Sequence, residues 1–368
     1  MANIKITYMK HSLRALLMLG VLGCFLACEK PVPEEPEEPE TPEVPAAPGE
    51  AKPNPSENAG SIEDYDENTL FEREKLCVGT YNILAADARD AAGANTWSAA
   101  KSTISRIISE MRCDVMTLNE LHDTEISYLK TDLDGYEWIL HHNENNSYRF
   151  APGIIYRPSR LEKEADGIFW LNNPDATSLQ TAAGAYTYDG YSAAPHRCCV
   201  WARFLDKNTG RSFYYFAAHP EIRGADADSP KANTLECLNA GNIRSLAAQI
   251  RLINSDNLPI VIAGDLNTHS KHISYDVFKS AGWIDAFVAA SSARCISGES
   301  LEAPGTDVGT NPEAYVTNES RRVDFVLYSG FDIRSYTSIY SRYNGIYPSD
   351  HLPIKTELIF CPFLRQDL

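Results

Sequence analysis

Short apolar runs recur along the chain from residue 76 to residue 358, and they constrain the fold more than any other feature of the sequence. Many of them show the alternation of strands that are covered on one face. Between them, Trp97–Met111 carries apolar residues at helical spacing, including Ile104, Ile107 and Ile108. Strands and helices that alternate in one chain predict two packed β-sheets with helices outside them.

The apolar pattern also locates the individual elements. Strands are expected at 76–83, 114–118, 136–142, 153–157, 198–205, 212–218, 260–263, 323–328 and 352–358. Helices are expected at Trp97–Met111, at 240–253 and around 275–281. About 300 residues, 68–368, are enough for one large α/β domain and do not require two.

The N-terminus is predicted to be a processing signal. Basic residues precede an apolar run over 15–27 that is too short to span a bilayer comfortably. Cys24 lies inside this run and Cys28 follows it, and each pattern resembles a bacterial lipoprotein cleavage site. We favour 1–28 as a lipoprotein signal peptide with lipidation at Cys28, because polar sequence begins directly after it. An ordinary signal peptide cut near Ala27 and a short uncleaved anchor are the alternatives.

Residues 29–67 are predicted to be a disordered acidic linker rich in Pro and Glu, since they hold too few large apolar residues to form a core. Such a linker would hold the folded body away from a membrane at the cell envelope. Of the net charge of −17, residues 1–28 contribute +3 and residues 29–67 contribute −11, which leaves −9 for residues 68–368. An acidic body disfavours a broad basic surface for nucleic acid, although bound cations would offset carboxylates within one cleft.

Several of the strand-like runs end in a residue suited to cation or proton chemistry. Carboxylates that follow several strands can converge at one edge of a sheet, where a hard dication finds the oxygen ligands that it needs. Each of these residues alone also fits a turn cap or the first turn of a helix. The segments are Asn82, Asn119-Glu120, His219, Asp265-Leu266-Asn267, Asp324 and Ser349-Asp350-His351.

The order of these segments resembles the endonuclease/exonuclease/phosphatase superfamily, which contains deoxyribonuclease I. The resemblance extends from about residue 76 to residue 359. It implies a four-layer α/β/β/α sandwich, in which two mixed β-sheets are flanked by helices. It also implies a metal-dependent phosphoric ester hydrolase.

The same resemblance implies the ligands of a Mg²⁺ or Mn²⁺ ion. Glu120 would be the principal carboxylate ligand, helped by Asn82 and by Asp350. Asp265 would orient or activate the attacking water. The cation would draw charge from a phosphate oxygen, which suits a reaction that builds charge on oxygen.

The remaining members would handle the phosphate and the leaving group. Asn267 would donate to the phosphate, and His351 would contact it while Asp324 fixes the tautomer of the imidazole. His219 would be the general acid for the leaving oxygen. Where deoxyribonuclease I has the glutamate that supports its catalytic histidine, this chain has Phe150.

Phe150 at this position makes deoxyribonuclease activity less expected, unless Glu221 or Glu144 replaces the missing carboxylate.

Other segments resemble bacterial hydrolases of the superfamily, in which Arg197 would reach an anionic substrate. A surface or buried ion pair is the alternative role for Arg197. Three tyrosines, Tyr186, Tyr188 and Tyr191, would line a specificity loop or serve as packing residues.

The leading hypothesis is a monomeric phosphoesterase of the cell envelope, lipid-anchored to the membrane. Its substrate would be a phosphomonoester or phosphodiester of a small molecule, a lipid head group or a sugar. A nuclease that degrades DNA or RNA outside the cytoplasm is the second hypothesis. A binding lipoprotein that keeps the fold without catalysis is the third, and the complete set of site residues argues against it.

Overall fold

The computed structural model describes residues 73–89, 95–142, 151–222, 230–290, 304–309, 315–340 and 347–361. They belong to one compact unit, Ile62–Leu368. The predicted signal peptide, the predicted linker, Cys28, Glu144 and Phe150 lie outside the described residues. Within the described ranges, no helix combines the length and the apolar character that crossing a membrane requires.

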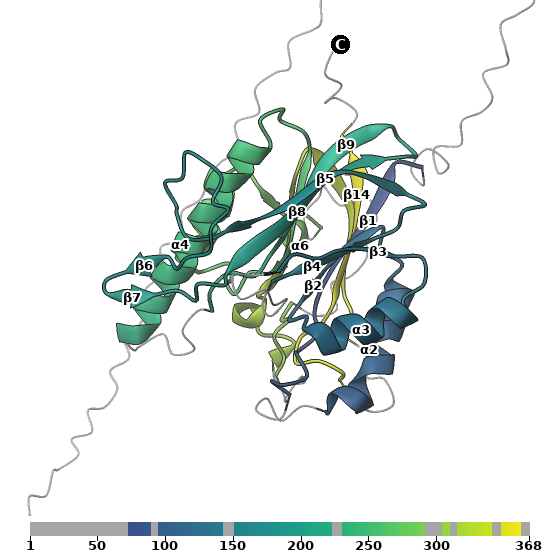
Figure 1. Ribbon diagram of the computed structural model, residues 1–368, viewed down its shortest axis with the longest axis horizontal. Helices are drawn as coiled ribbons and strands as arrows, with labels where there is room; N and C mark the ends of the chain where they lie inside the picture. The colour runs from purple at the N-terminus through teal and green to yellow at the C-terminus, as the bar shows by residue number, and fades with distance from the viewer. Residues whose placement is uncertain are drawn as a thin grey trace, which may run out of the picture. The chain divides into compact units, whose positions relative to one another are not determined.

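Two six-stranded sheets form the centre of this unit (Figure 1). Sheet A has the order β13-β14-β1-β2-β4-β3, and sheet B has the order β11-β12-β10-β9-β8-β5. The strands of sheet A are β1 (Lys75–Asn82), β2 (Val115–Asn119), β3 (Glu137–Ile139), β4 (Gly153–Tyr156), β13 (Phe331–Ser338) and β14 (Ile354–Phe360). Those of sheet B are β5 (Leu161–Trp170), β8 (Cys198–Asp206), β9 (Arg211–Ala218), β10 (Ile260–Asp265), β11 (Ile284–Asp285) and β12 (Asp324–Ser329).

Both sheets are mixed. In sheet A only β1 and β2 run parallel, and in sheet B only β9 and β10 do. The ends of parallel neighbours lie at the same edge of a sheet. A separate two-stranded ribbon, β6 (Thr187–Tyr188) with β7 (Tyr191–Ser192), interrupts the connection from β5 to β8.

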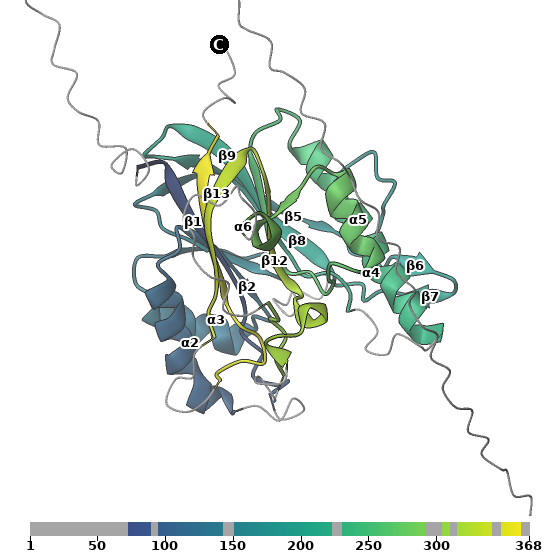
Figure 2. The same ribbon diagram turned by 180° about the vertical axis from the view of Figure 1, so that it is seen from behind.

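Helices cover the outer face of each sheet, as Figures 1 and 2 show from opposite sides. On sheet A, α2 (Trp97–Met111) and α3 (Asp123–Asp132) bury an apolar cluster that includes Ile104 and Leu129. On sheet B, α4 (Pro230–Ile253) and α5 (Ile273–Ser280) bury a second cluster. A third cluster, with Phe204, Phe213 and Phe331, fills the space between the sheets. The short helices α6 (Ala286–Ala290) and η1 (Glu319–Arg321) complete the described elements.

This arrangement confirms the predicted four-layer α/β/β/α sandwich. The expected boundaries were wrong in places, since α4 begins at Pro230 and not at residue 240. The sequence pattern did not predict β5, β13 or α3. In β5 the residues Glu162, Lys163 and Glu164 are exposed in succession, so the strand lacks a clean alternation.

Candidate active site

Polar residues converge at one end of the two sheets because of how the strands pair. Asn82 lies opposite Asn119 in the parallel pair β1 and β2, and Asp265 lies opposite Asp324 in the antiparallel pair β10 and β12. Asn119 joins the sheets, because its Nδ2 donates to the carbonyl of Ala218 over 3.3 Å and its Oδ1 accepts from the N–H of Asp265 over 3.0 Å. The ends of β1, β2 and β10 therefore meet the beginning of β12.

Asn82 connects the two predicted catalytic carboxylates. Its Nδ2 donates to Glu120 Oε1 over 2.9 Å and to Asp265 Oδ2 over 3.1 Å. Its Oδ1 accepts from the N–H of Leu84 over 3.1 Å, so the amide oxygen does not face Glu120. Glu120 has φ of 62°, a conformation that costs energy for a residue with a side chain. In this structure Asn82 donates to both carboxylates, and its role as a cation ligand stays a prediction.

Asp265 lies between two histidines from different segments, His219 after β9 and His351 before β14. Its Oδ2 is 3.6 Å from His219 Nε2 and 3.8 Å from His351 Nε2. On the other side of the His351 ring, Nδ1 and Asp324 Oδ2 are 2.7 Å apart. The predicted pair of His351 with Asp324 is thus present, and Asp265 is 2% exposed at the centre.

Burial sets the protonation of these groups. Desolvation raises the pKa of Asp265 to about 7, assisted by the charge of Asp324 and opposed by that of His351. Desolvation alone would lower the pKa of His351, but the carboxylates of Asp324 and Asp265 hold it well above its usual value. His351 is therefore a cation at neutral pH, able to donate from Nε2.

His219 differs from His351 because, among the described residues, no carboxylate bonds its Nδ1. Burial lowers its pKa well below the usual value, and the positive charges of Arg197, His351 and His196 lower it further. Its Nδ1 is buried and makes no hydrogen bond among the described residues. Glu221, one of the two suggested replacements, instead accepts from Arg197 Nη2 over 3.3 Å and from the N–H of Ile222 over 2.8 Å.

Arg197 is 6% exposed and is ion-paired with Glu221. This geometry matches the buried ion pair, the alternative to a role in binding an anionic substrate.

Asn267 adopts φ of 51° and donates from Nδ2 to the carbonyl of Pro220 over 3.2 Å. Its N–H donates to Asp265 Oδ1 over 3.0 Å, so Asn267 also fixes the carboxylate of Asp265.

A family model for endonucleases, exonucleases and phosphatases matches residues 79–351, which include the whole cluster of strand-end residues. The chain belongs to the endonuclease/exonuclease/phosphatase family. The predicted family and the predicted phosphoric ester hydrolase are both confirmed at this level. No curated protein matches the chain.

Solved structures of this family share the fold. A family protein from Bacteroides thetaiotaomicron is 24% identical with a TM-score of 0.61, over 78% of this chain and 98% of its own. A mannosyl-6-phosphatase from the same organism is 25% identical with a TM-score of 0.61, over 77% of this chain and 100% of its own. The human Nocturnin catalytic domain is 20% identical with a TM-score of 0.57, over 78% of this chain and 94% of its own.

Enzymes of the endonuclease/exonuclease/phosphatase family generally depend on divalent cations, and the donor chemistry here fits one. Burial raises the pKa of Asp350; the charge of His351 opposes this effect, and the negative charges of Glu120 and Asp307 add to it. The carboxylates of Asp350 and Glu120 are the kind of oxygen ligand that a hard dication takes. Ligand atoms of Asp265, Asp324 and His351 also lie within 4.8 Å of one another. That group is the weaker candidate, because a protonated His351 has no lone pair to offer.

Two supporting residues, Arg89 and Thr306, escaped the sequence pattern. Arg89 is 1% exposed and donates to the carbonyls of Ile83 over 2.7 Å and Pro348 over 2.9 Å, which ties the end of β1 to the segment before Asp350. Thr306 Oγ1 accepts from the N–H of Asp324 over 3.1 Å. No sequence signal distinguishes a lone Arg or Thr in a loop.

Gly264, directly before Asp265, also supports the site. It has φ of 151°, and an added Cβ would lie 2.1 Å from the carbonyl oxygen of Ala218. Only glycine lets β10 approach the end of β9 this closely, so Gly264 brings Asp265 next to His219.

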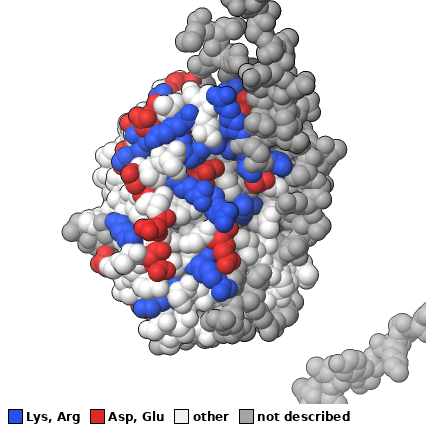
Figure 3. Space-filling model, turned by 90° about the vertical axis from the view of Figure 1, so that its right-hand side faces the viewer, with Lys and Arg blue, Asp and Glu red and all other residues white. Residues whose placement is uncertain are grey.

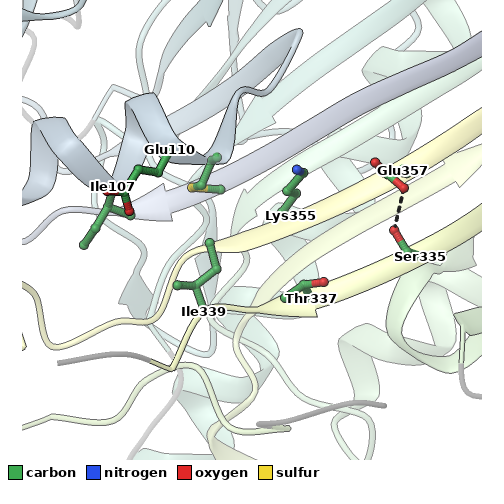
Figure 4. A pocket seen from close by; sticks show the side chains of 8 residues that line it. Ile107, Glu110, Ser335, Thr337, Ile339, Lys355 and Glu357 are labelled. Atoms are coloured by element: carbon green, nitrogen blue, oxygen red, sulfur yellow. Dashed lines mark hydrogen bonds between the residues drawn. The ribbon is translucent and has the colours of Figure 1, made fainter. Parts of the chain in front are cut away.

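The cavity in Figure 4 is separate from this cluster. It has a volume of about 290 Å³ and lies between α2 and the strands β13 and β14, on the outer face of sheet A. Ser335 donates to Glu357 across it over 3.1 Å, and Lys355 extends into it beside them (Figure 4). Its lining includes none of the predicted site residues.

Proposed function

We propose that this protein is a divalent-metal-dependent phosphoesterase of the cell envelope that hydrolyses a phosphomonoester of a small molecule by in-line attack of water. The observation that carries the proposal is the position of Asp265 between His219 and His351, with Glu120 linked to it through Asn82. Asp265 as the base, His219 as the acid and His351 as the donor to the phosphate are thereby placed around one reacting group.

The charge of each side chain determines its proposed role in the reaction. Ionised Asp265 would take a proton from the attacking water, and its orientation is fixed by Asn82 and by the N–H of Asn267. His351, held by Asp324, would donate from Nε2 to a phosphate oxygen. His219 would give its proton to the leaving oxygen. A Mg²⁺ or Mn²⁺ ion held by Glu120 and Asp350 would supply charge stabilisation at the phosphate.

Two observations support a small phosphomonoester over a nucleic acid. The mannosyl-6-phosphatase of Bacteroides thetaiotaomicron shares the fold and 25% of its residues with this chain. On the face shown in Figure 3, basic and acidic side chains are interspersed. The acidic net charge points in the same direction.

Removal of divalent cations is expected to lower turnover at least about 100-fold, because charge on the phosphate oxygens would lose its main stabilisation. Turnover of a hexose 6-phosphate, glycerol phosphate, bis-p-nitrophenyl phosphate, DNA and RNA is measured after chelation and after adding back Mg²⁺ or Mn²⁺. Glu120→Gln should require more cation for half-maximal activity. Glu110→Gln, a matched change at an exposed glutamate of α2, should not.

Chelator-insensitive turnover would contradict the metal dependence. So would equal cation requirements in wild type and Glu120→Gln. Preferential cleavage of DNA or RNA would establish the nuclease instead of the phosphomonoesterase.

The envelope location rests on the N-terminal sequence, in which Cys28 follows the apolar run. With two acyl chains on this cysteine, most of the full-length protein is expected in the detergent phase of a two-phase partition, since each buried methylene contributes about 0.8 kcal/mol. Cys28→Ala should move it to the aqueous phase, while Cys24→Ala should leave it in the detergent phase. Equal partitioning of wild type and Cys28→Ala would refute lipidation at this residue.

A further inference from the structure

The ribbon of β6 and β7 presents two exposed aromatic rings at its tip. Tyr188 and Tyr191 are directly paired across the two strands and are 43% and 53% exposed. The turn between them consists of Asp189 with φ of 50° and Gly190 with φ of 76°, a geometry typical of a tight type I′ hairpin. A directly opposed pair places both rings on the same face of the ribbon.

The hairpin is held firmly against α4. The ring of Tyr186 packs so closely on Gly241 that an added Cβ would lie 1.9 Å from it. The carbonyl of Tyr186 accepts from the N–H of Ala193 over 2.8 Å, which closes the base of the hairpin. Of the three tyrosines, Tyr186 is a packing residue, while the other two keep exposed faces.

This hairpin belongs to the end of sheet B that carries His219. It connects the end of β5 to the start of β8, and Cys199 of β8 pairs with Ala218, the residue before His219. The chain leaves the hairpin through His196 and Arg197, whose charges lower the pKa of His219 after the larger effect of burial. His219, the predicted general acid for the leaving oxygen, therefore lies at the same end of sheet B as the two strand ends that the hairpin connects.

We propose that Tyr188 and Tyr191 form the subsite for the leaving group, and that this subsite takes the ring of a hexopyranose. The inference rests on the proposed function, because it assigns the hairpin to the leaving-group side of the same reaction. Aromatic faces pack on the apolar C–H face of a sugar ring, while the tyrosine hydroxyls can bond its hydroxyl groups. No Lys or Arg lies within the hairpin itself, which suits a neutral moiety better than a second anion.

Kinetics on the full chain would test the subsite. Tyr188→Ala/Tyr191→Ala is expected to raise KM for a hexose 6-phosphate about 3- to 10-fold with kcat nearly unchanged, and to leave KM for glycerol phosphate unchanged. The variant Tyr188→Phe/Tyr191→Phe keeps the rings and should retain most of the affinity. Leu252→Ala, at an exposed apolar residue of α4, is the control for a general surface effect.

Saturation-transfer NMR with a methyl hexopyranoside separates this inference from the proposed function, because the probe carries no phosphate. Hexoside binding that is lost in the double alanine variant supports the subsite even if wild type hydrolyses no phosphate ester. Turnover of hexose 6-phosphate that is unaffected by the double change, or equal losses on both substrates, would overturn the subsite. So would a loss confined to nucleotides or to binding of phospholipid vesicles.

Discussion

Replacing Asp265 with Asn is expected to lower kcat by about 10³-fold. The amide keeps the shape of the carboxylate, and its oxygen can still accept from the N–H of Asn267, a bond of 3.0 Å in the native protein. It cannot take a proton from the attacking water. The loss should therefore appear in kcat with little change in the melting temperature, as measured by steady-state kinetics and thermal unfolding at saturating Mg²⁺.

The pH profile provides a second readout for Asp265. Burial raises its pKa to about 7, and only the ionised carboxylate can act as a base, so kcat/KM of the wild type should rise as pH increases through that region. A bound cation would move this limb to lower pH. Asp132→Asn, at an exposed acid at the end of α3, is the matched control and should behave as wild type. Turnover of Asp265→Asn within about tenfold of wild type would exclude the general-base role.

The positions of the site residues were predictable because the place where a strand ends is a local property of the sequence. Asn82, Asp265 and Asp324 each lie at a strand end, and a residue at such a position is carried to the edge of the sheet whatever the side chains around it do. The four layers followed in the same way from apolar periodicity. The pairing of His351 with Asp324 came from the resemblance to the family, and the 2.7 Å contact agrees with it.

Orientation and support were not predictable, because they depend on contacts between distant segments. The amide of Asn82 turns its nitrogen to Glu120 and Asp265, both of which are distant in the chain. Arg197 is buried against Glu221, and its sequence neighbourhood does not distinguish an ion pair from a substrate contact. Arg89 contacts Pro348, far along the chain, so no local pattern marks it.

Replacing His219 with Ala should impair substrates in proportion to the basicity of their leaving group. For a sugar phosphate, whose alkoxide is strongly basic, kcat is expected to fall about 10³-fold, whereas p-nitrophenyl phosphate should lose less than about tenfold. In the substrate-free protein His219 is neutral at pH 7, because burial and the charges of Arg197 and His351 lower its pKa. The negative charge of a bound phosphate would raise that pKa and restore the proton that the leaving oxygen needs.

The comparison of the two substrates distinguishes an acid from a positioning residue. If His219 only orients Asp265, from which its Nε2 is 3.6 Å away, both substrates should lose activity equally, and the general-acid role is then wrong. His141→Ala is the matched control, because this histidine bonds Asp166 over 3.0 Å and belongs to neither strand end of the site. Its kcat on both substrates should stay at the wild-type value. If His219 is the general acid, a carboxylate introduced beside its buried Nδ1 should raise its pKa. The limb on which kcat/KM falls with increasing pH should then move to higher pH.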